Sequence, residues 1–138
     1  MKNIDRNEIT SVELTEDQDI YKENIIDYYK NPRNKGKLKD YNYKHKEINP
    51  LCGDEITLYI KVNKDKISEV NFMGKGCAIS QASISMLTEK LKDMSTTEAK
   101  KLKKEDILKM LGIPISFVRM KCALLSLKTL TKSLEKIT

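Results

Sequence analysis

The sequence lacks long apolar runs. No stretch approaches the roughly 18 apolar residues that a membrane span requires. The first residues, MKNIDRNEITSVELTEDQD, are polar and acidic, and they contain no apolar core of a signal peptide. We therefore expect a cytoplasmic protein with no membrane partner, in which residues 1–17 form a flexible tail and residues 18–138 form a single domain.

Cysteine is also scarce, and the number of cysteines is odd. The chain has three, and it has only one histidine. Without a secretory signal, an odd cysteine count argues against a disulfide framework. Metal binding or thiol chemistry is then the leading explanation for these residues.

Aromatic residues are sparse too, at 6% of the chain. The net charge of +6 comes from 26 Lys and Arg against 20 Asp and Glu, and basic residues alternate with acidic ones in KKLKKEDILK. No aromatic side chains interleave with that run to stack on bases. A nucleic-acid partner is therefore not expected, and the lysines are interpreted as a solvated helix face or as contacts to an acidic protein.

What is present is the composition of one globular domain, with 39% hydrophobic and 33% charged residues in 138 positions. An apolar stripe at helical spacing predicts a first helix over 20–30, which Pro32 and Gly36 end. Residues 37–48 have a weak pattern that fits a loop with a strand. Stronger β-patterns at 55–62 and 67–72, with a short turn between them, predict an antiparallel hairpin.

The second half of the sequence changes to helical spacing. A broad apolar surface follows Cys77 and predicts a buried helix. Ser95 with Glu98 forms a capping box for a short helix, residues 105–111 form another, and a stripe from Ala123 to Ile137 marks the last helix. The order of elements predicts an α+β fold, in which a small antiparallel sheet of about three strands carries helices on one face.

The three cysteines fall at the ends of these elements. Cys52 precedes the first strong strand, Cys77 opens the buried helix and Cys122 begins the last helix, while Asp54 follows Cys52 with only Gly53 between. Because the two strands are paired, the start of one and the end of the other meet at one edge of the sheet. Three thiolates and a carboxylate form a set suited to zinc or to an iron–sulfur cluster.

At two positions, an ordinary structural role is an alternative to metal binding. Cys122 is followed by Ala-Leu-Leu, so its periodicity fits a core residue as well as a ligand. His45 lies among lysines, and a solvated side chain is a better interpretation than a metal ligand.

Three segments carry a resemblance to a known family. NPLCGDEITLYIKV, FMGKGCAISQASISMLTEKLK and VRMKCALLSLKTL resemble the iron–sulfur scaffold proteins typified by IscU, SufU and the N-terminal domain of NifU. YKENIIDYYKNPRNKGKL is similar to the opening helix and turn of that family. The resemblance covers roughly residues 21–134 and implies an IscU-like fold.

By this resemblance, Cys52, Asp54, Cys77 and Cys122 would bind the metal or cluster. It implies a scaffold that accepts sulfur from a cysteine desulfurase, builds a transient [2Fe–2S] cluster and transfers it to apo-proteins. It implies a carrier rather than an enzyme in the strict sense. Cys52 and Cys122 are the candidates for carrying the persulfide, and the carboxylate of Asp54 should keep the cluster labile.

Features of two subgroups are combined in the chain. Arg119, Lys121 and Cys122 resemble the SufU pattern, in which an arginine replaces a histidine ligand, and Arg119 is the candidate auxiliary residue. The 45-residue spacing between the last two cysteines is the shorter spacing of IscU. Ile115–Arg119 replaces the segment that an Hsp70-type chaperone reads in IscU proteins, which weakens the expectation of chaperone-assisted release.

Two alternatives remain open at this stage. Zinc in the same four-ligand site would make the chain a SufU-type sulfurtransferase partner of a cysteine desulfurase, which accepts sulfur without building a cluster. A structural zinc domain that binds RNA through its lysines ranks well behind, because the sequence has no basic aromatic surface.

Overall fold

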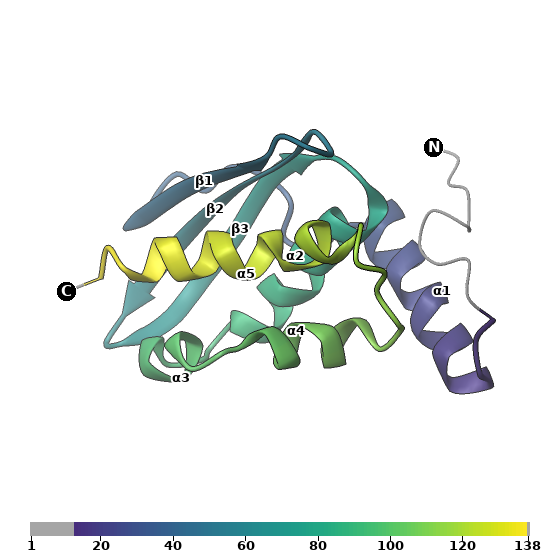
Figure 1. Cartoon of the computed structure of the whole chain (residues 1–138). Coiled ribbons are helices and arrows are strands. Elements are labelled where there is room, and N and C mark those ends of the chain that lie inside the picture. The colour runs from purple at the N-terminus through teal and green to yellow at the C-terminus, as the bar shows by residue number, and fades with distance from the viewer. Residues whose placement is uncertain (1–12, 138) are drawn as a thin grey trace.

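The computed structural model describes residues 13–137, which form eight helices and strands. Figure 1 shows a sheet on one side of the molecule and the helices on the other. In chain order the elements are α1 (Glu16–Lys30), β1 (Tyr43–Asn49), β2 (Asp54–Asn63), β3 (Lys66–Lys75), α2 (Ala78–Leu91), α3 (Thr96–Lys100), α4 (Lys104–Leu111) and α5 (Met120–Leu134).

The sheet has three antiparallel strands in the order β1-β2-β3. Glu55 at the start of β2 pairs with Lys75 at the end of β3, so these two strand ends lie at the same edge. The register shifts between Lys61 and Val62, where Ser68 is an extra residue on β3. This bulge explains why Ile67 and Val70, three positions apart, are both buried.

The helices form two layers on one face of the sheet. Helix α5 packs against β1 and β2, helix α2 packs against β3, and the two helices contact each other. Helices α1, α3 and α4 lie farther from the sheet and pack mainly on α2 and α5 (Figure 1). Between residues 13 and 137 the structure has no helix of the length and apolarity that crossing a bilayer would need.

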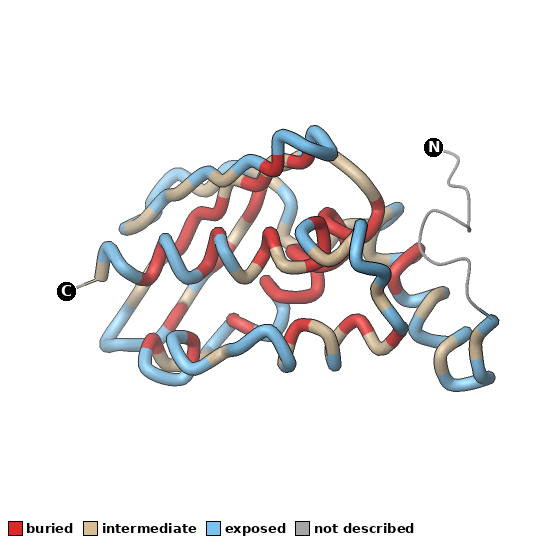
Figure 2. The backbone as a smooth tube through the Cα atoms, in the orientation of Figure 1, coloured by how far each residue is buried: buried red, intermediate tan, exposed pale blue. Residues whose placement is uncertain are grey.

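The core lies between the sheet and the inner pair of helices. Figure 2 shows that the buried backbone runs along the strands and along α2 and α5. Twelve of the fourteen residues of α2 are buried, so this helix is enclosed on nearly all sides. Large side chains that are fully enclosed include Phe72, Leu58, Ile84 and Leu87. The broad apolar surface that the sequence predicted for α2 is confirmed.

Hydroxyl groups join the two inner helices. Ser83 on α2 and Ser126 on α5 are fully buried, and their hydroxyl oxygens are 2.6 Å apart. The Ser83 hydroxyl also lies 3.1 Å from the carbonyl oxygen of Ala123, to which it can donate. Because Ala123 follows Cys122, these bonds fix the start of α5 relative to α2.

The α+β class, the three-stranded sheet and the helices on one face are confirmed. Helix α1 begins at Glu16, four residues before the predicted stripe, because Thr15 and Gln18 form a capping box. Of the box predicted at Ser95, the bond from the Glu98 backbone N–H to the Ser95 hydroxyl is present, at 3.0 Å. Residues 1–12 of the predicted tail lie outside the described residues.

We expect a double-mutant cycle to measure the contact between α2 and α5. Ser83→Ala should lower the free energy of unfolding by about 1–2 kcal/mol, since it leaves the buried Ser126 hydroxyl without this partner. Ser126→Ala should lower it by about 1 kcal/mol, since Ser83 keeps its bond to the Ala123 carbonyl. The double variant should cost about 1 kcal/mol less than the sum of the two. Chemical denaturation measures all three values.

A matched control is the pair Ser83→Ala and Ser68→Ala. Ser68 donates to the Lys61 carbonyl at the bulge and, within residues 13–137, forms no hydrogen bond to α5. These two effects should add. Strict additivity for Ser83 and Ser126 as well would show that the hydroxyl pair does not couple the helices.

Candidate metal centre

The turn between β1 and β2 carries Cys52 and precedes Asp54. It comprises residues 50–53, and Gly53 takes a φ of +70° that few other residues tolerate. The backbone N–H of Cys52 donates to the carbonyl of Asn49 at 3.3 Å, which closes the turn. As a result Cys52 is exposed, while Asp54, two residues later, is fully buried.

Asp54 is held by the segment that leads into α2. Its Oδ1 accepts a hydrogen bond of 2.8 Å from the backbone N–H of Cys77, the N-cap of α2. Gly76 makes this approach possible, because a Cβ at that position would lie 2.2 Å from Asp54 Oδ1 and its φ is +141°. The glycine-rich segment before α2 therefore approaches the start of β2 closely at this point.

Cys122 reaches the same place from the first turn of α5. The ligand atoms of Cys52, Asp54 and Cys122 all lie within 4.8 Å of one another. Cys122 is fully buried, and the side-chain amide of Asn49 points toward its sulfur at 3.8 Å. The helix therefore delivers this sulfur to the other two groups, although it is enclosed from solvent.

The chemistry of the three groups fits a metal ion. Among the described residues Asp54 Oδ2 is buried and has no hydrogen-bond partner. A buried oxygen of this kind is costly unless something binds it. Sulfurs on one tetrahedral zinc lie roughly 3.8 Å apart, given Zn–S bonds of about 2.3 Å, so small movements bring these atoms to bonding distance.

The side chain of Cys77 is not part of the three-atom group. Its thiol lies instead near the guanidinium of Arg119, as does that of Cys122. Burial lowers the pKa of Arg119, but the charges of Cys77 and Cys122 outweigh it and the pKa is raised overall. The structure therefore brings together three of the four predicted ligands, with Arg119 between the fourth and Cys122.

The three thiols differ in accessibility. Cys52 is exposed, Cys77 is half-buried and Cys122 is buried. Burial raises the pKa of the Cys122 thiol far above its usual value, and the nearby Cys52 and Asp54 raise it further. Cys122 is therefore enclosed, and Cys52 is the sulfur that an incoming molecule meets first.

Other residues near the site were either set aside or missed by the sequence analysis. His45 pairs with Glu47 at 2.8 Å and is absent from the group of ligand atoms found in residues 13–137. Asn49 was missed, because an asparagine before a proline indicates only a turn. Its location opposite Asp54 in the β1–β2 register places it beside Cys122.

Comparison with known proteins agrees with this geometry. The family model described as the NifU-like N terminal domain matches residues 20–138. The zinc-dependent sulfurtransferase SufU of Bacillus subtilis is 37% identical over 134 residues, covering 85% of this chain and 90% of that protein. The iron–sulfur cluster assembly scaffold protein IscU of Thermotoga maritima is 35% identical over 135 residues, covering 86% of this chain and 95% of that protein.

Solved structures show the same fold. A crystal structure described as a SUF-system scaffold protein from Fervidobacterium islandicum has a TM-score of 0.70 and 32% identity, covering 81% of this chain and 94% of the other. A NifU-like N-terminal domain from Brucella abortus has a TM-score of 0.71, covers 87% of this chain and 95% of its own, and at 20% identity shows the fold alone. The chain therefore belongs to the NifU-like N-terminal domain family, which includes the IscU and SufU proteins of iron–sulfur cluster assembly.

Proposed function

We propose that the protein is an iron–sulfur cluster assembly scaffold that builds a labile [2Fe–2S] cluster on Cys52, Asp54, Cys77 and Cys122. The observation that carries this proposal is the convergence of Cys122, from the start of α5, on Cys52 and Asp54, whose second carboxylate oxygen is buried and unpaired among the described residues. We infer that Cys77 would join them by a side-chain rotation, and the bond from its backbone N–H to Asp54 Oδ1 supports this.

Sulfur enters through Cys52 in this proposal. A cysteine desulfurase presents a persulfide, and the Cys52 thiolate attacks its outer sulfur. A new S–S bond forms on Cys52, the S–S bond of the donor breaks, and the donor leaves as a thiolate. Exposure of Cys52 supports this order, while Cys122 would receive sulfur only after the centre opens.

Arg119 assists by holding negative charge. Its guanidinium already lies near the thiols of Cys77 and Cys122. An incoming sulfur is anionic, so the same cation would stabilise it until iron arrives. When iron binds, the Cys77 sulfur would leave Arg119 and become a ligand of the metal.

Partner binding is supported by an apolar rim beside the site, formed by Leu51, Phe117 and Val118. Their exposed fractions are 78%, 96% and 75%. Leu51 adjoins Cys52, and Phe117 and Val118 precede Arg119 in the chain. Exposed apolar side chains grouped beside a functional site indicate a surface for other proteins, here the desulfurase and the apo-proteins that receive the cluster.

The second candidate is a zinc-bound sulfurtransferase partner of a cysteine desulfurase. The name of the Bacillus subtilis relative and the arginine at the site favour it. Zinc would occupy the same four ligands, and Cys52 would carry sulfur onward without a cluster.

Purification without oxygen, followed by reconstitution with iron and sulfide, separates the two functions. A scaffold should take up about two irons and two sulfides per site and show visible absorption, and Cys77→Ser should greatly reduce both. Tightly bound zinc that iron and sulfide do not displace, with sulfur transfer intact, would establish the second function instead.

Thiol alkylation tests the order of sulfur acceptance. In the metal-free protein, iodoacetamide should modify Cys52 first and Cys122 last, because Cys122 is enclosed and its thiol pKa is raised. Mass spectrometry of digests measures each rate, and the denatured chain, in which all three should react alike, is the control. Equal rates for Cys52 and Cys122 in the folded protein would contradict this order.

Replacing the carboxylate tests why the cluster is labile. A carboxylate is a weaker ligand for cluster iron than a thiolate, so Asp54→Ala should slow cluster transfer to an apo-ferredoxin, followed by visible circular dichroism. Asp40→Ala removes an exposed acid elsewhere and should leave the transfer rate unchanged. Transfer from the Asp54 variant at the rate of the unsubstituted protein would show that Asp54 does not control release.

A further inference from the structure

Gly76 also lines a separate cavity of about 270 Å³, which none of the four predicted metal ligands lines. Its walls come from the end of α1 with the turn after it, from the end of β3 and from α2. Ligand pockets for drug-sized molecules are roughly 300–1,000 Å³. The cavity therefore fits a molecule smaller than a typical drug.

Gln81 provides a polar group in the cavity wall. Its side chain is 6% exposed, and its Oε1 is buried without a hydrogen-bond partner among the described residues. The amide orientation is fixed, because Nε2 donates to Ser80 Oγ at 3.2 Å and to the Glu55 carbonyl at 3.4 Å. The unpaired atom is thus an acceptor that needs a donor.

Gly74 lies directly against this amide. A Cβ on Gly74 would lie 2.5 Å from the Glu55 carbonyl oxygen and 2.8 Å from Gln81 Oε1, so a larger residue would clash with both atoms. Gly74 and Gln81 both line the cavity. A ligand that carries a hydroxyl group would supply the missing donor at this place.

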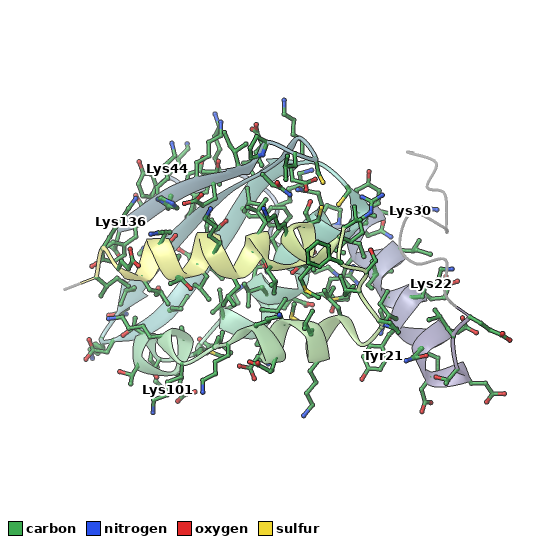
Figure 3. The ribbon with its side chains drawn as sticks, in the orientation of Figure 1. Tyr21, Lys22, Lys30, Lys44, Lys101 and Lys136 are labelled. Atoms are coloured by element: carbon green, nitrogen blue, oxygen red, sulfur yellow. The ribbon has the colours of Figure 1, made fainter. Side chains whose placement is uncertain are left out.

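Three lysines surround the same cavity. Lys30, Lys35 and Lys75 line it, and none forms an ion pair within residues 13–137. Glu55, opposite Lys75 in the sheet, is paired with Lys46 instead. Figure 3 shows Lys30 at the end of α1 that approaches the sheet, away from Lys22 and Tyr21. Like charges around one cavity repel, and an anion between them relieves that repulsion.

We propose that this cavity binds a small polyanion that carries a hydroxyl group, either a hydroxycarboxylate or a phosphate monoester. The anionic oxygens pair with Lys30, Lys35 and Lys75, and the hydroxyl donates to Gln81 Oε1. The site is distinct from the metal centre, and it does not depend on the function proposed for that centre.

Titration of the isotope-labelled full chain tests this site by NMR. The protein is used free of metal, so that chelation cannot contribute, and its dispersed amide spectrum verifies folding. Citrate should give saturable shifts at the Gln81 side-chain amide and at Gly74 and Gly76. Tricarballylate has the same three carboxylates without the hydroxyl, and it should bind about fivefold more weakly.

A matched pair of variants tests the lysines. The triple variant Lys30→Ala, Lys35→Ala, Lys75→Ala should weaken citrate binding by roughly tenfold. The control Lys37→Ala, Lys39→Ala, Lys109→Ala removes the same charge from exposed positions that do not line the cavity, and its affinity should be unchanged. Glycerol 3-phosphate is titrated in parallel, and the tighter of the two ligands identifies the source.

Three outcomes would overturn the proposal. The first is that neither citrate nor glycerol 3-phosphate saturates the shifts. The second is that the two triple variants weaken binding equally, which would indicate attraction to net charge alone. The third is that tricarballylate binds as tightly as citrate, which would remove the role assigned to Gln81.

Discussion

The carboxylate of Asp54 is the group on which the metal centre depends. It lies at the first position of β2, beneath the segment that joins β3 to α2, and Gly76 is the residue that leaves room for it. The N–H of Cys77 binds one of its oxygens and leaves the other free. A negative group that is buried and half-satisfied favours the binding of a cation, and the surrounding sulfurs select a soft one.

The rest of the fold places three cysteines near this carboxylate, and their side chains differ in how freely they can move. Helix α5 is fixed on the sheet and joined to α2 by the serine hydroxyls, so Cys122 has a defined location. Cys52 is on an exposed turn, and Cys77 is at a helix start with its side chain turned toward Arg119. One rigid and two adjustable sulfurs would suit the proposed function, in which a cluster is assembled and then released.

The fold class and the clustering of Cys52, Asp54 and Cys122 could be predicted from the sequence. Alternating apolar residues identified β2 and β3, and the cysteines lie near the ends of the predicted elements. The bulge at Ser68 could not be predicted, because its extra residue is visible only in the pairing register. The arrangement of Arg119 between Cys77 and Cys122, and the role of Asn49, depend on side-chain rotamers that have no periodic signal. Gln81 likewise looked like one more residue of a buried helix face, and only its unpaired oxygen distinguishes it.

The burial of Cys122 and Asp54 limits how other molecules can reach the candidate metal site. Both are fully buried, whereas Cys52 and the neighbouring Leu51 face solvent, so the turn between β1 and β2 is an exposed approach to the candidate site. Under the proposed function, a sulfur donor and a cluster acceptor would both approach the site at this turn and would compete for it.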